Sequence, residues 1–408
     1  MKCRHCQAEL ERMFLDLGTA PPSNAYLTRE QLDRPERHDP LRVRACTRCW
    51  LVQAEDHAAR EDLFASHYAY FSSYSSTWLA HAERYVDAMV ERLGLDARSH
   101  VVEVASNDGY LLQYVQRRGI PCLGIEPTAG TAEAARARGI ETRVAFFGRT
   151  LAAQLAQEGR AADLMVANNV LAHVPDIVDF AAGFAQLLRP HGVATFEFPH
   201  LLRLVEECQF DTVYHEHYSY LSLVAVERIF GAAGLAVFDV EELPTHGGSL
   251  RVHAQRADSG RRPRTGAVAA LLGREERAGL ASPRIGEGLQ ARAERIKDDV
   301  LLFLIEQKRA RRTVCGYGAA AKGSTLLNFA GVRTDLLPCV ADASPHKQGR
   351  FLPGSRIPIV DVGALRARRP DFVLVLPWNL KDEIAEQLRD FRAWGARFVT
   401  AIPELAIA

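Results

Sequence analysis

The sequence has no excess of charge of either sign. Its 408 residues include 50 lysines and arginines and 50 aspartates and glutamates, so the formal net charge is zero. Proteins that hold nucleic acid through its phosphates usually carry a basic excess. The balance speaks against a DNA- or RNA-binding protein without excluding a local basic patch, and we expect no nucleic-acid partner.

Long apolar runs and a disulfide pattern are also missing. No segment approaches the ~18 apolar residues of a membrane span, and the first residues do not resemble a secretory signal. Eight cysteines occur in this long chain, four of them as two close pairs, which is more typical of metal binding than of disulfides. We therefore expect a cytoplasmic protein without a membrane partner. The oligomeric state is not indicated.

Strand-like and helix-like segments alternate along most of the chain, which predicts an α/β fold with mainly parallel sheets. We expect strands at 100–104, 121–125, 163–167, 193–198, 236–240 and 249–254, and again at 312–316, 336–341, 372–376 and 396–401. Between them we expect helices at 108–118, 129–138, 149–157, 176–189, 223–233, 321–329 and 380–390. The predicted units are 1–65, a metal-binding domain; 66–255, an α/β domain; 256–310, a linker and long helix; and 311–408, a second α/β domain.

Two Cys-x-x-Cys pairs lie near the N-terminus, Cys3 with Cys6 and Cys46 with Cys49. This spacing lets both sulfurs of a pair reach one tetrahedral ion at ~2.3 Å. Four thiolates close the coordination shell, so the pattern predicts a structural zinc ion. A redox pair or free thiols are the alternative.

Polar side chains follow three predicted strands of the first α/β unit. The first strand runs into a tight turn with small residues, the second ends in an acid that can bind ribose hydroxyls, and the third ends in amides. Acids without a phosphate-binding glycine loop favour S-adenosylmethionine, a cation without phosphate, over NAD; an NAD-type or vestigial fold is the alternative. The candidate cofactor-binding residues are Glu103, Ser106, Asn107, Asp108, Glu126, Asn168 and Asn169.

Ionisable and aromatic residues are most concentrated at 210–220, where Tyr214, Glu216 and His217 lie close together. Histidine is the usual proton acceptor near neutral pH, a carboxylate can orient it, and a tyrosine hydroxyl can donate to a developing oxyanion. A second metal site and a purely structural aromatic cluster are the alternatives. His173 follows the amides of the third strand and is a further candidate.

Other segments are predicted to close the same cavity or to bind an anion. A glycine-rich turn at 316–323 precedes a predicted helix and could bind a diphosphate through its N–H groups and a lysine; glycines that serve only packing are the alternative. Aromatic residues at 68–74 could form a lid. The candidate substrate-binding residues are Tyr68, Tyr70, Tyr74, His246, Lys322 and Asn379.

With these motifs, nearly the whole chain resembles the sugar C-methyltransferases of deoxysugar pathways, enzymes of antibiotic biosynthesis. The motifs that carry the resemblance are Cys3/Cys6/Cys46/Cys49 and residues 70–74, 103–109, 124–127, 168–173, 214–217, 246–251 and 317–323. The resemblance implies a zinc-binding domain, a Rossmann-like class I methyltransferase domain and a C-terminal Rossmann-like domain that binds a nucleotide sugar. One departure is Ala105, which stands where such enzymes often carry glycine.

The resemblance also implies a reaction. A dTDP-4-keto-deoxysugar would be methylated at C-3′ from S-adenosylmethionine, with His217 removing the proton next to the ketone and Glu216 orienting His217. Removal of the proton by Tyr214 is the alternative. Tyr214 and His173 would stabilise the enolate oxygen. A methyltransferase acting at oxygen or nitrogen of another small molecule is the alternative, and a zinc-module protein that binds RNA is disfavoured by the neutral charge.

Metal analysis tests the zinc prediction. We expect about one zinc ion per chain, because four thiolates form one tetrahedral site. A metal-free preparation that is folded and fully active would contradict the prediction.

Overall fold

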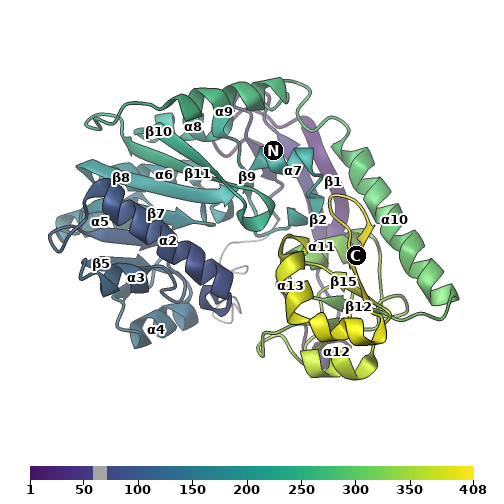
Figure 1. The fold of residues 1–408 in the computed structure, drawn as a ribbon. Coiled ribbons are helices and arrows are strands. Elements are labelled where there is room, and N and C mark those ends of the chain that lie inside the picture. The colour runs from purple at the N-terminus through teal and green to yellow at the C-terminus, as the bar shows by residue number, and fades with distance from the viewer. Residues whose placement is uncertain (58–70) are drawn as a thin grey trace.

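The computed structural model describes residues 1–57 and 71–408. In this part of the chain, three β-sheets are packed against helices (Figure 1). The predicted lid residues Tyr68 and Tyr70 lie outside the described ranges. The first sheet is N-terminal and lies between the other two in the view of Figure 1. In spatial order it contains β1 (Arg12–Ala20), β2 (Asp39–Ala45), β3 (Val52–Ala54) and β9 (Ser219–Tyr220).

The second sheet has seven strands, and all but one of them run in the same direction. The exception is β11, which is antiparallel to its neighbours β8 and β10. This confirms the mainly parallel sheet predicted from the alternation of strands and helices. In spatial order the strands are β10 (Leu235–Leu243), β11 (Ser249–Arg256), β8 (Leu188–Pro199), β7 (Ala162–Asn168), β4 (Val101–Val104), β5 (Cys122–Ile125) and β6 (Thr142–Arg143).

Both faces of this sheet are covered by helices, which explains why its central strands are apolar at successive positions. Val101 and Leu164 belong to a core with α2 and α3, whereas the adjacent Val102 and Met165 belong to a core with α5, α6 and α8. These helices are α2 (Ser76–Leu93), α3 (Leu112–Arg117), α4 (Ala129–Ala137), α5 (Arg149–Gln157), α6 (Ile177–Leu187), α8 (Leu223–Ala232) and α9 (Gly266–Arg277). The short helix α7 (Leu201–Glu206) packs instead into the core between the first and third sheets.

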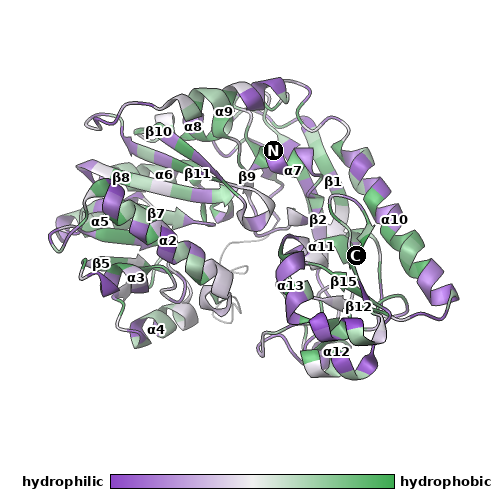
Figure 2. Ribbon diagram, in the orientation of Figure 1, coloured by the Kyte–Doolittle hydropathy of each residue, from purple (hydrophilic) through white to green (hydrophobic). Residues whose placement is uncertain are grey.

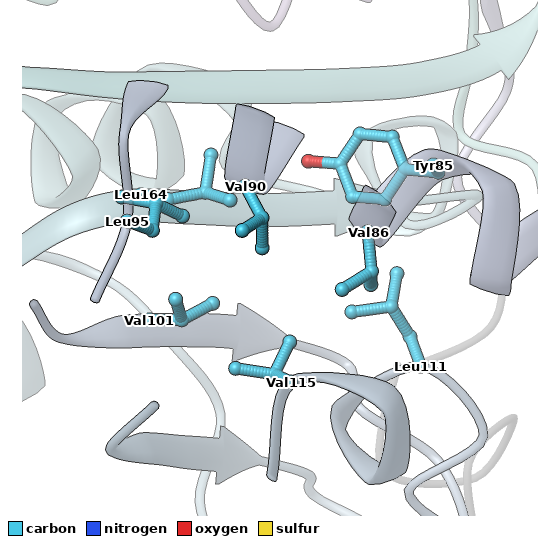
Figure 3. Close-up of a pocket in the computed structure, with 8 residues that line it drawn as sticks. All are labelled: Tyr85, Val86, Val90, Leu95, Val101, Leu111, Val115 and Leu164. Carbon is cyan, nitrogen blue, oxygen red and sulfur yellow. The ribbon is translucent and has the colours of Figure 1, made fainter. Parts of the chain in front are cut away.

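Figure 3 shows how α2 packs onto the first of these faces. Tyr85, Val86 and Val90 of α2 face an apolar floor of Val101, Leu111, Val115 and Leu164. Strand and helix side chains close this seam almost completely, so it is a packing interface. The predicted cofactor-binding residues lie instead at the carboxyl ends of the strands.

The third sheet confirms the second α/β unit. Its strands are parallel except for the last, which is antiparallel to β16. In spatial order they are β14 (Ile359–Val360), β13 (Val340–Ala341), β12 (Val314–Tyr317), β15 (Phe372–Val375), β16 (Arg397–Thr400) and β17 (Ala406–Ile407). The helices are α10 (Leu289–Arg309), which leads into the sheet, α11 (Ala321–Phe329), α12 (Val362–Arg368) and α13 (Lys381–Gln387).

Several predicted elements are shorter than expected, and two of them have a clear local cause. The strand predicted at 336–341 spans only 340–341, because residues 333–337 close a turn and Pro338 has no N–H for a ladder. The helix predicted at 108–118 begins at Leu112, because Asn107 and Gly109 adopt positive φ angles of 49° and 78° in a tight turn.

A single apolar core joins the first and third sheets. It includes side chains of β1 and β2, of residues 201–220, of α10 and of the C-terminal strands. Figure 2 shows the corresponding pattern, with apolar residues along the strands and alternating polar and apolar bands along α10. Among the described residues, no helix combines the length and the apolar character needed to span a membrane.

Strand β9 is the unexpected member of the first sheet. It lies more than 160 residues after β3 in the sequence yet pairs with it, with Val52 opposite Tyr220 and Gln53 opposite Ser219. The segment 210–220 is therefore attached at its end to the N-terminal sheet.

A buried carboxyl of α9 holds the turn that follows β9. Glu275 accepts hydrogen bonds from the Nε2 of His200 at 2.6 Å and from the backbone N–H groups of Leu223 and Val224 at 2.7 and 2.8 Å. It therefore caps α8 from another helix, and neither Glu275 nor His200 is more than 1% exposed.

Removal of this carboxyl tests its structural role. We expect Glu275→Ala to lower the free energy of unfolding by roughly 3 kcal/mol, because buried donors lose their acceptor. The adjacent exposed Glu276 is the matched control, and Glu276→Ala should change stability by less than about 0.5 kcal/mol in chemical denaturation. Equal effects of the two changes would contradict this role.

Candidate functional site

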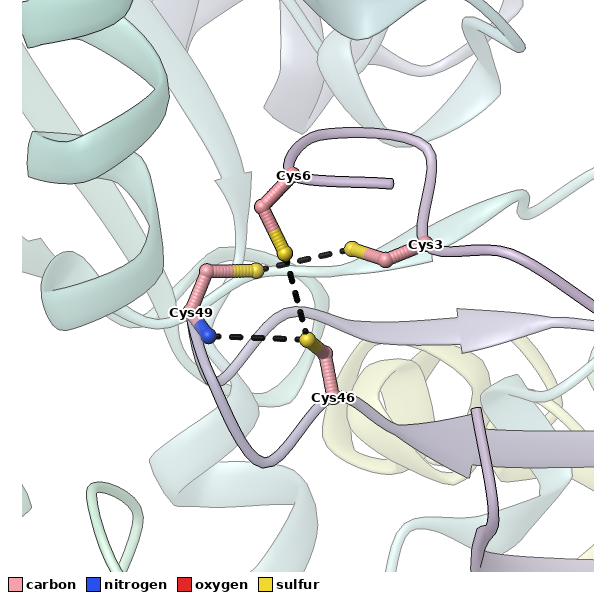
Figure 4. A group of neighbouring side chains, drawn as sticks. All are labelled: Cys3, Cys6, Cys46 and Cys49. Atoms are coloured by element: carbon pink, nitrogen blue, oxygen red, sulfur yellow. Dashed lines mark hydrogen bonds between the residues drawn. The ribbon is translucent and has the colours of Figure 1, made fainter. Parts of the chain in front are cut away.

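The four predicted metal ligands converge in one cluster. Their Sγ atoms all lie within 4.8 Å of one another, and the closest pairs, Cys3 with Cys49 and Cys6 with Cys46, are 3.5 Å apart (Figure 4). An ion with four sulfurs at ~2.3 Å separates them by ~3.8 Å, so the cluster fits tetrahedral zinc. The Nε2 of Gln53 donates to the Cys3 Sγ at 3.3 Å, which supports a thiolate there. None of the four cysteines is in a disulfide.

The turn after β4 is built for a ligand that approaches the backbone closely. Ala105, Asn107 and Gly109 all have positive φ angles, 58°, 49° and 78°. An L-residue in this region costs roughly 1–2 kcal/mol, so Ala105 is strained where glycine would not be. At Gly124 on the adjacent β5, an added Cβ would lie 2.5 Å from the Ser106 Oγ. The turn and β5 are therefore packed closely against each other, as a site that binds a cofactor through the backbone requires.

The predicted cofactor-binding side chains meet at this edge of the sheet. Glu126 accepts hydrogen bonds from the backbone N–H groups of Asn107 at 3.0 Å and Thr128 at 2.9 Å. Burial raises the pKa of Glu103 well above its usual range, and the charges of Asp108 and Glu126 raise it further. Clustered acids of this kind suit a cationic ligand.

Several buried polar atoms at the same edge have no hydrogen-bond partner in the described part of the chain. They are both carboxyl oxygens of Glu103, both amide atoms of Asn168 and the hydroxyl of Ser106. Unpaired buried polar groups are costly unless a ligand satisfies them. The amino group, sulfonium and ribose hydroxyls of S-adenosylmethionine offer such partners, so the residues fit this cofactor.

Residues 71–74, the part of the predicted lid that is described, rest against this turn. The backbone N–H of Ser72 donates to the Asn107 Oδ1 at 2.9 Å, and the hydroxyl of Ser73 donates to Asp108. Tyr74 is 60% exposed, and its hydroxyl lies 3.2 Å from the Nε2 of His346 in the C-terminal unit. The segment thus links the cofactor edge to the third sheet.

The segment 210–220 places two histidines side by side. The rings of His173 and His217 are 4.6 Å apart. The Nδ1–H of His217 donates to the Thr212 carbonyl at 2.9 Å, and the Nδ1–H of His173 donates to the Glu216 carbonyl at 2.8 Å. A carbonyl can only accept, so in the neutral rings each Nε2 carries the lone pair.

Both histidines are held in the neutral form. Burial lowers the pKa of His217 well below its usual range, and the positive charge of a protonated His173 would lower it further. Burial lowers the pKa of His173 to about 4. His217 therefore has a basic Nε2 at neutral pH, while the neutral Nε2 of His173 can accept a hydrogen bond and cannot donate one.

The Glu216 carboxylate does not bond to the Nδ1 of His217, which is the direct contact that the predicted orienting role suggests. The Oε1 of Glu216 accepts from the backbone N–H and the side-chain amide of Asn24, at 3.2 and 3.1 Å, and the Thr212 carbonyl orients His217. A backbone carbonyl leaves no pattern in the sequence, so this partner was not predictable. Tyr214 does lie beside His217 as expected, with ring centroids 4.0 Å apart.

A buried lysine of the C-terminal unit lies near this segment. The Nζ of Lys322 donates to the Asn379 Oδ1 at 2.8 Å and to the His246 carbonyl at 3.3 Å, and it lies over the Trp378 ring. Burial lowers the pKa of Lys322 to about 8, and Asp211 counteracts this. Three predicted substrate-binding residues, Lys322, Asn379 and His246, are therefore adjacent.

The third sheet and the cofactor edge meet at His246. Its Nε2 accepts from the Asn169 Nδ2 at 2.9 Å, and its φ angle is 55°. The indole N–H of Trp378 donates to the Asp211 Oδ2 at 2.8 Å. Trp378 and Asp211 were not predicted as site residues, although each adjoins a predicted motif.

The turn at 316–323 differs from the expected diphosphate cradle. The backbone N–H of Ala319 donates to the Asp342 carboxyl at 2.8 Å, and those of Gly318 and Ala320 donate to backbone carbonyls. An acid thus occupies the position expected for an anion. Lys322 remains the group of this turn that offers positive charge to the interior.

Three family models match successive parts of the chain. They are described as a zinc binding domain for residues 3–64, a methyltransferase domain for residues 78–240 and a C-methyltransferase C-terminal domain for residues 244–403.

Two curated relatives differ greatly in the extent of their match. The chain is 35% identical to the C-methyltransferase NovU of Streptomyces niveus over 403 residues, 99% of this chain and 96% of that protein. A ubiquinone biosynthesis O-methyltransferase of Azorhizobium caulinodans is 26% identical over 115 residues, 26% of this chain and 46% of that protein.

Among solved structures, magnesium protoporphyrin IX methyltransferase from Synechocystis PCC 6803 aligns with a TM-score of 0.33 and 16% identity, covering 44% of this chain and 81% of that chain. The full-length similarity to NovU shows the family, and the cysteine cluster and the cofactor edge agree with it. The chain therefore belongs to the S-adenosylmethionine-dependent C-methyltransferases that carry an N-terminal zinc-binding domain.

Proposed function

We propose that this enzyme methylates a dTDP-linked 4-keto-deoxysugar at C-3′, the carbon next to the ketone. The observation that carries the proposal is the neutral, buried His217 with a fixed tautomer, adjacent to Tyr214. A C–H next to a ketone needs a base, whereas the oxygen or nitrogen acceptors of other methyltransferases lose a more acidic proton. Burial keeps the imidazole of His217 uncharged at neutral pH, so its Nε2 lone pair is available to accept a proton.

The residues divide the work between proton removal and charge stabilisation. The Nε2 of His217 takes the proton, and the electron pair of the C–H bond moves toward the ketone oxygen. The Tyr214 hydroxyl donates to that oxygen, since the neutral His173 has no proton at Nε2 to give. His173 instead accepts a hydrogen bond and restricts the ring of His217.

S-adenosylmethionine, when bound, supplies an electrophilic methyl group on its sulfonium. Glu103, Ser106, Asn107, Asp108, Glu126, Asn168 and Asn169 would hold it at the edge of the second sheet. Asn169 also bonds to His246, so the cofactor edge adjoins the part of the protein that carries Lys322. The proposed methyl donor and sugar would thus be bound by adjoining parts of the protein, which favours their proximity.

The nucleotide part of the substrate is assigned to the C-terminal unit. Lys322 and Asn379 offer donors toward an anion, although Asn379 also accepts from Lys322, and Tyr74 lies at the opening beside His346. A place in antibiotic deoxysugar biosynthesis follows from this substrate class. A reducing cytoplasm is the proposed location, because the four thiols must stay reduced to bind zinc.

Mass spectrometry in heavy water tests the reaction. With S-adenosylmethionine and dTDP-4-keto-deoxysugars we expect the sugar to gain one methyl group. We expect His217→Ala and Tyr214→Phe to lower turnover by roughly 10²–10⁴-fold, because general acid–base groups contribute on this scale, while S-adenosylmethionine binding measured by calorimetry stays unchanged. Near-normal rates in both variants, or methylation at oxygen or nitrogen of another acceptor, would contradict the proposal.

The pH dependence of activity tests the lowered pKa values of His217 and Lys322. His217 must be neutral to act, so activity is lost as pH falls through its lowered pKa, and the acidic limb of kcat should lie well below the usual histidine value of ~6.5. Lys322 loses its charge as pH rises through about 8, so KM for the anionic sugar should rise above that pH. Lys322→Arg should abolish this rise, since arginine stays charged. An acidic limb at or above 6.5 would contradict the neutral base.

A further inference from the structure

We infer that Asn24, a residue of the zinc-binding domain, positions the catalytic segment 214–217. The inference rests on the proposed role of His217 in removing a proton. Nothing in the sequence marked Asn24, which lies about 190 residues before the segment it holds. Asn24 is a positioning residue that acts through Glu216.

Asn24 makes two contacts to the same carboxyl oxygen. Its backbone N–H donates to the Glu216 Oε1 at 3.2 Å, and its side-chain amide donates to it at 3.1 Å. Glu216 is only 2% exposed, so water does not offer a ready alternative. Burial raises the pKa of Glu216, and the donors from Asn24 lower it, which shows that they stabilise the carboxylate.

The segment around Asn24 is itself firmly attached to the C-terminal unit. The Ser324 hydroxyl of α11 donates to the Ser23 carbonyl at 3.2 Å, and the Tyr26 hydroxyl donates to the Ala319 carbonyl at 2.6 Å. Leu27 pairs with Phe351 through backbone hydrogen bonds in both directions. The segment around Asn24 is thus anchored to the C-terminal unit, so that Asn24 can hold Glu216 in place.

Glu216 passes this constraint to both histidines. Its carbonyl accepts the Nδ1–H of His173, and the next residue is His217, whose backbone N–H donates to the Tyr214 carbonyl at 2.9 Å. The two histidine rings are in contact. A rotation of Glu216 therefore moves the base and its neighbour together. A displacement of about 1 Å can cost ~10²-fold in rate, so a single anchoring amide can matter for turnover.

The test compares Asn24→Ala with Gln290→Ala. Gln290 is the matched control, because its amide also joins the N-terminal unit to another part of the chain, through the backbone N–H of Asp16 at 2.9 Å and its carbonyl at 3.1 Å. It does not contact the catalytic segment. Asn24→Asp is a second variant that keeps the size of the side chain and replaces the amide donor by an oxygen. Each protein is studied as the full-length, zinc-loaded enzyme.

Two readouts separate positioning from a loss of general stability. By hydrogen-exchange mass spectrometry we expect faster exchange in peptides covering 211–218 for both Asn24 variants and not for Gln290→Ala. For deuterium uptake by a dTDP-4-keto-deoxysugar we expect kcat to fall roughly 10- to 100-fold with KM changed less than about twofold. In a Glu216→Ala background, Asn24→Ala should have little further effect, because the two residues act through one contact.

The outcomes distinguish this inference from the proposed function. Unchanged exchange in 211–218, a rate equal to that of Gln290→Ala, or additive losses with Glu216→Ala would overturn the role of Asn24 while His217→Ala still abolishes deuterium uptake. If His217→Ala also leaves uptake intact, the proposed reaction fails, and the exchange data alone then decide whether Asn24 holds the segment.

Discussion

The pairing of β3 with β9 is the constraint on which the rest of the site depends. It makes the last strand of the N-terminal sheet out of the residues that closely follow His217, the proposed base. Arg4, between two of the zinc-binding cysteines, strengthens the junction by donating to the Ala54 and Tyr218 carbonyls at 2.9 and 3.1 Å. The cysteine cluster is therefore joined through the backbone to the segment that carries the proposed base. The N-terminal domain thus supports the proposed active site.

The other supports come from the second and third sheets, so the catalytic segment lies where three sheets meet. Thr325 of α11 donates to the Val213 carbonyl at 2.8 Å, Trp378 bonds to Asp211, and His173 bonds to the Glu216 carbonyl. Each contact comes from a different part of the chain. A loop held at several points loses little additional entropy on binding substrate, which favours a well-aligned base.

Electrostatically, the two sides of the site are complementary to different ligands. The cofactor edge carries Glu103, Asp108 and Glu126, which suit a sulfonium cation, whereas the C-terminal unit contributes Lys322, which would suit the anionic part of the proposed substrate. His217 is kept neutral by burial, and the charge of Lys322 lowers its pKa further. Because the imidazole of His217 carries no net charge, neither the acids of the cofactor edge nor Lys322 attracts it strongly.

The sequence by itself determined the α/β class, most strands and helices, the cysteine cluster and the edge that holds the cofactor. These features depend on local spacing and on the rule that parallel strands end at one edge. Only the tertiary structure decided that Thr212, and not Glu216, orients His217, that Asp342 occupies the glycine-rich turn, and that Asn24 reaches the catalytic segment. Those contacts are made by backbone groups or by residues far apart in the chain, and neither leaves a periodic pattern in a sequence.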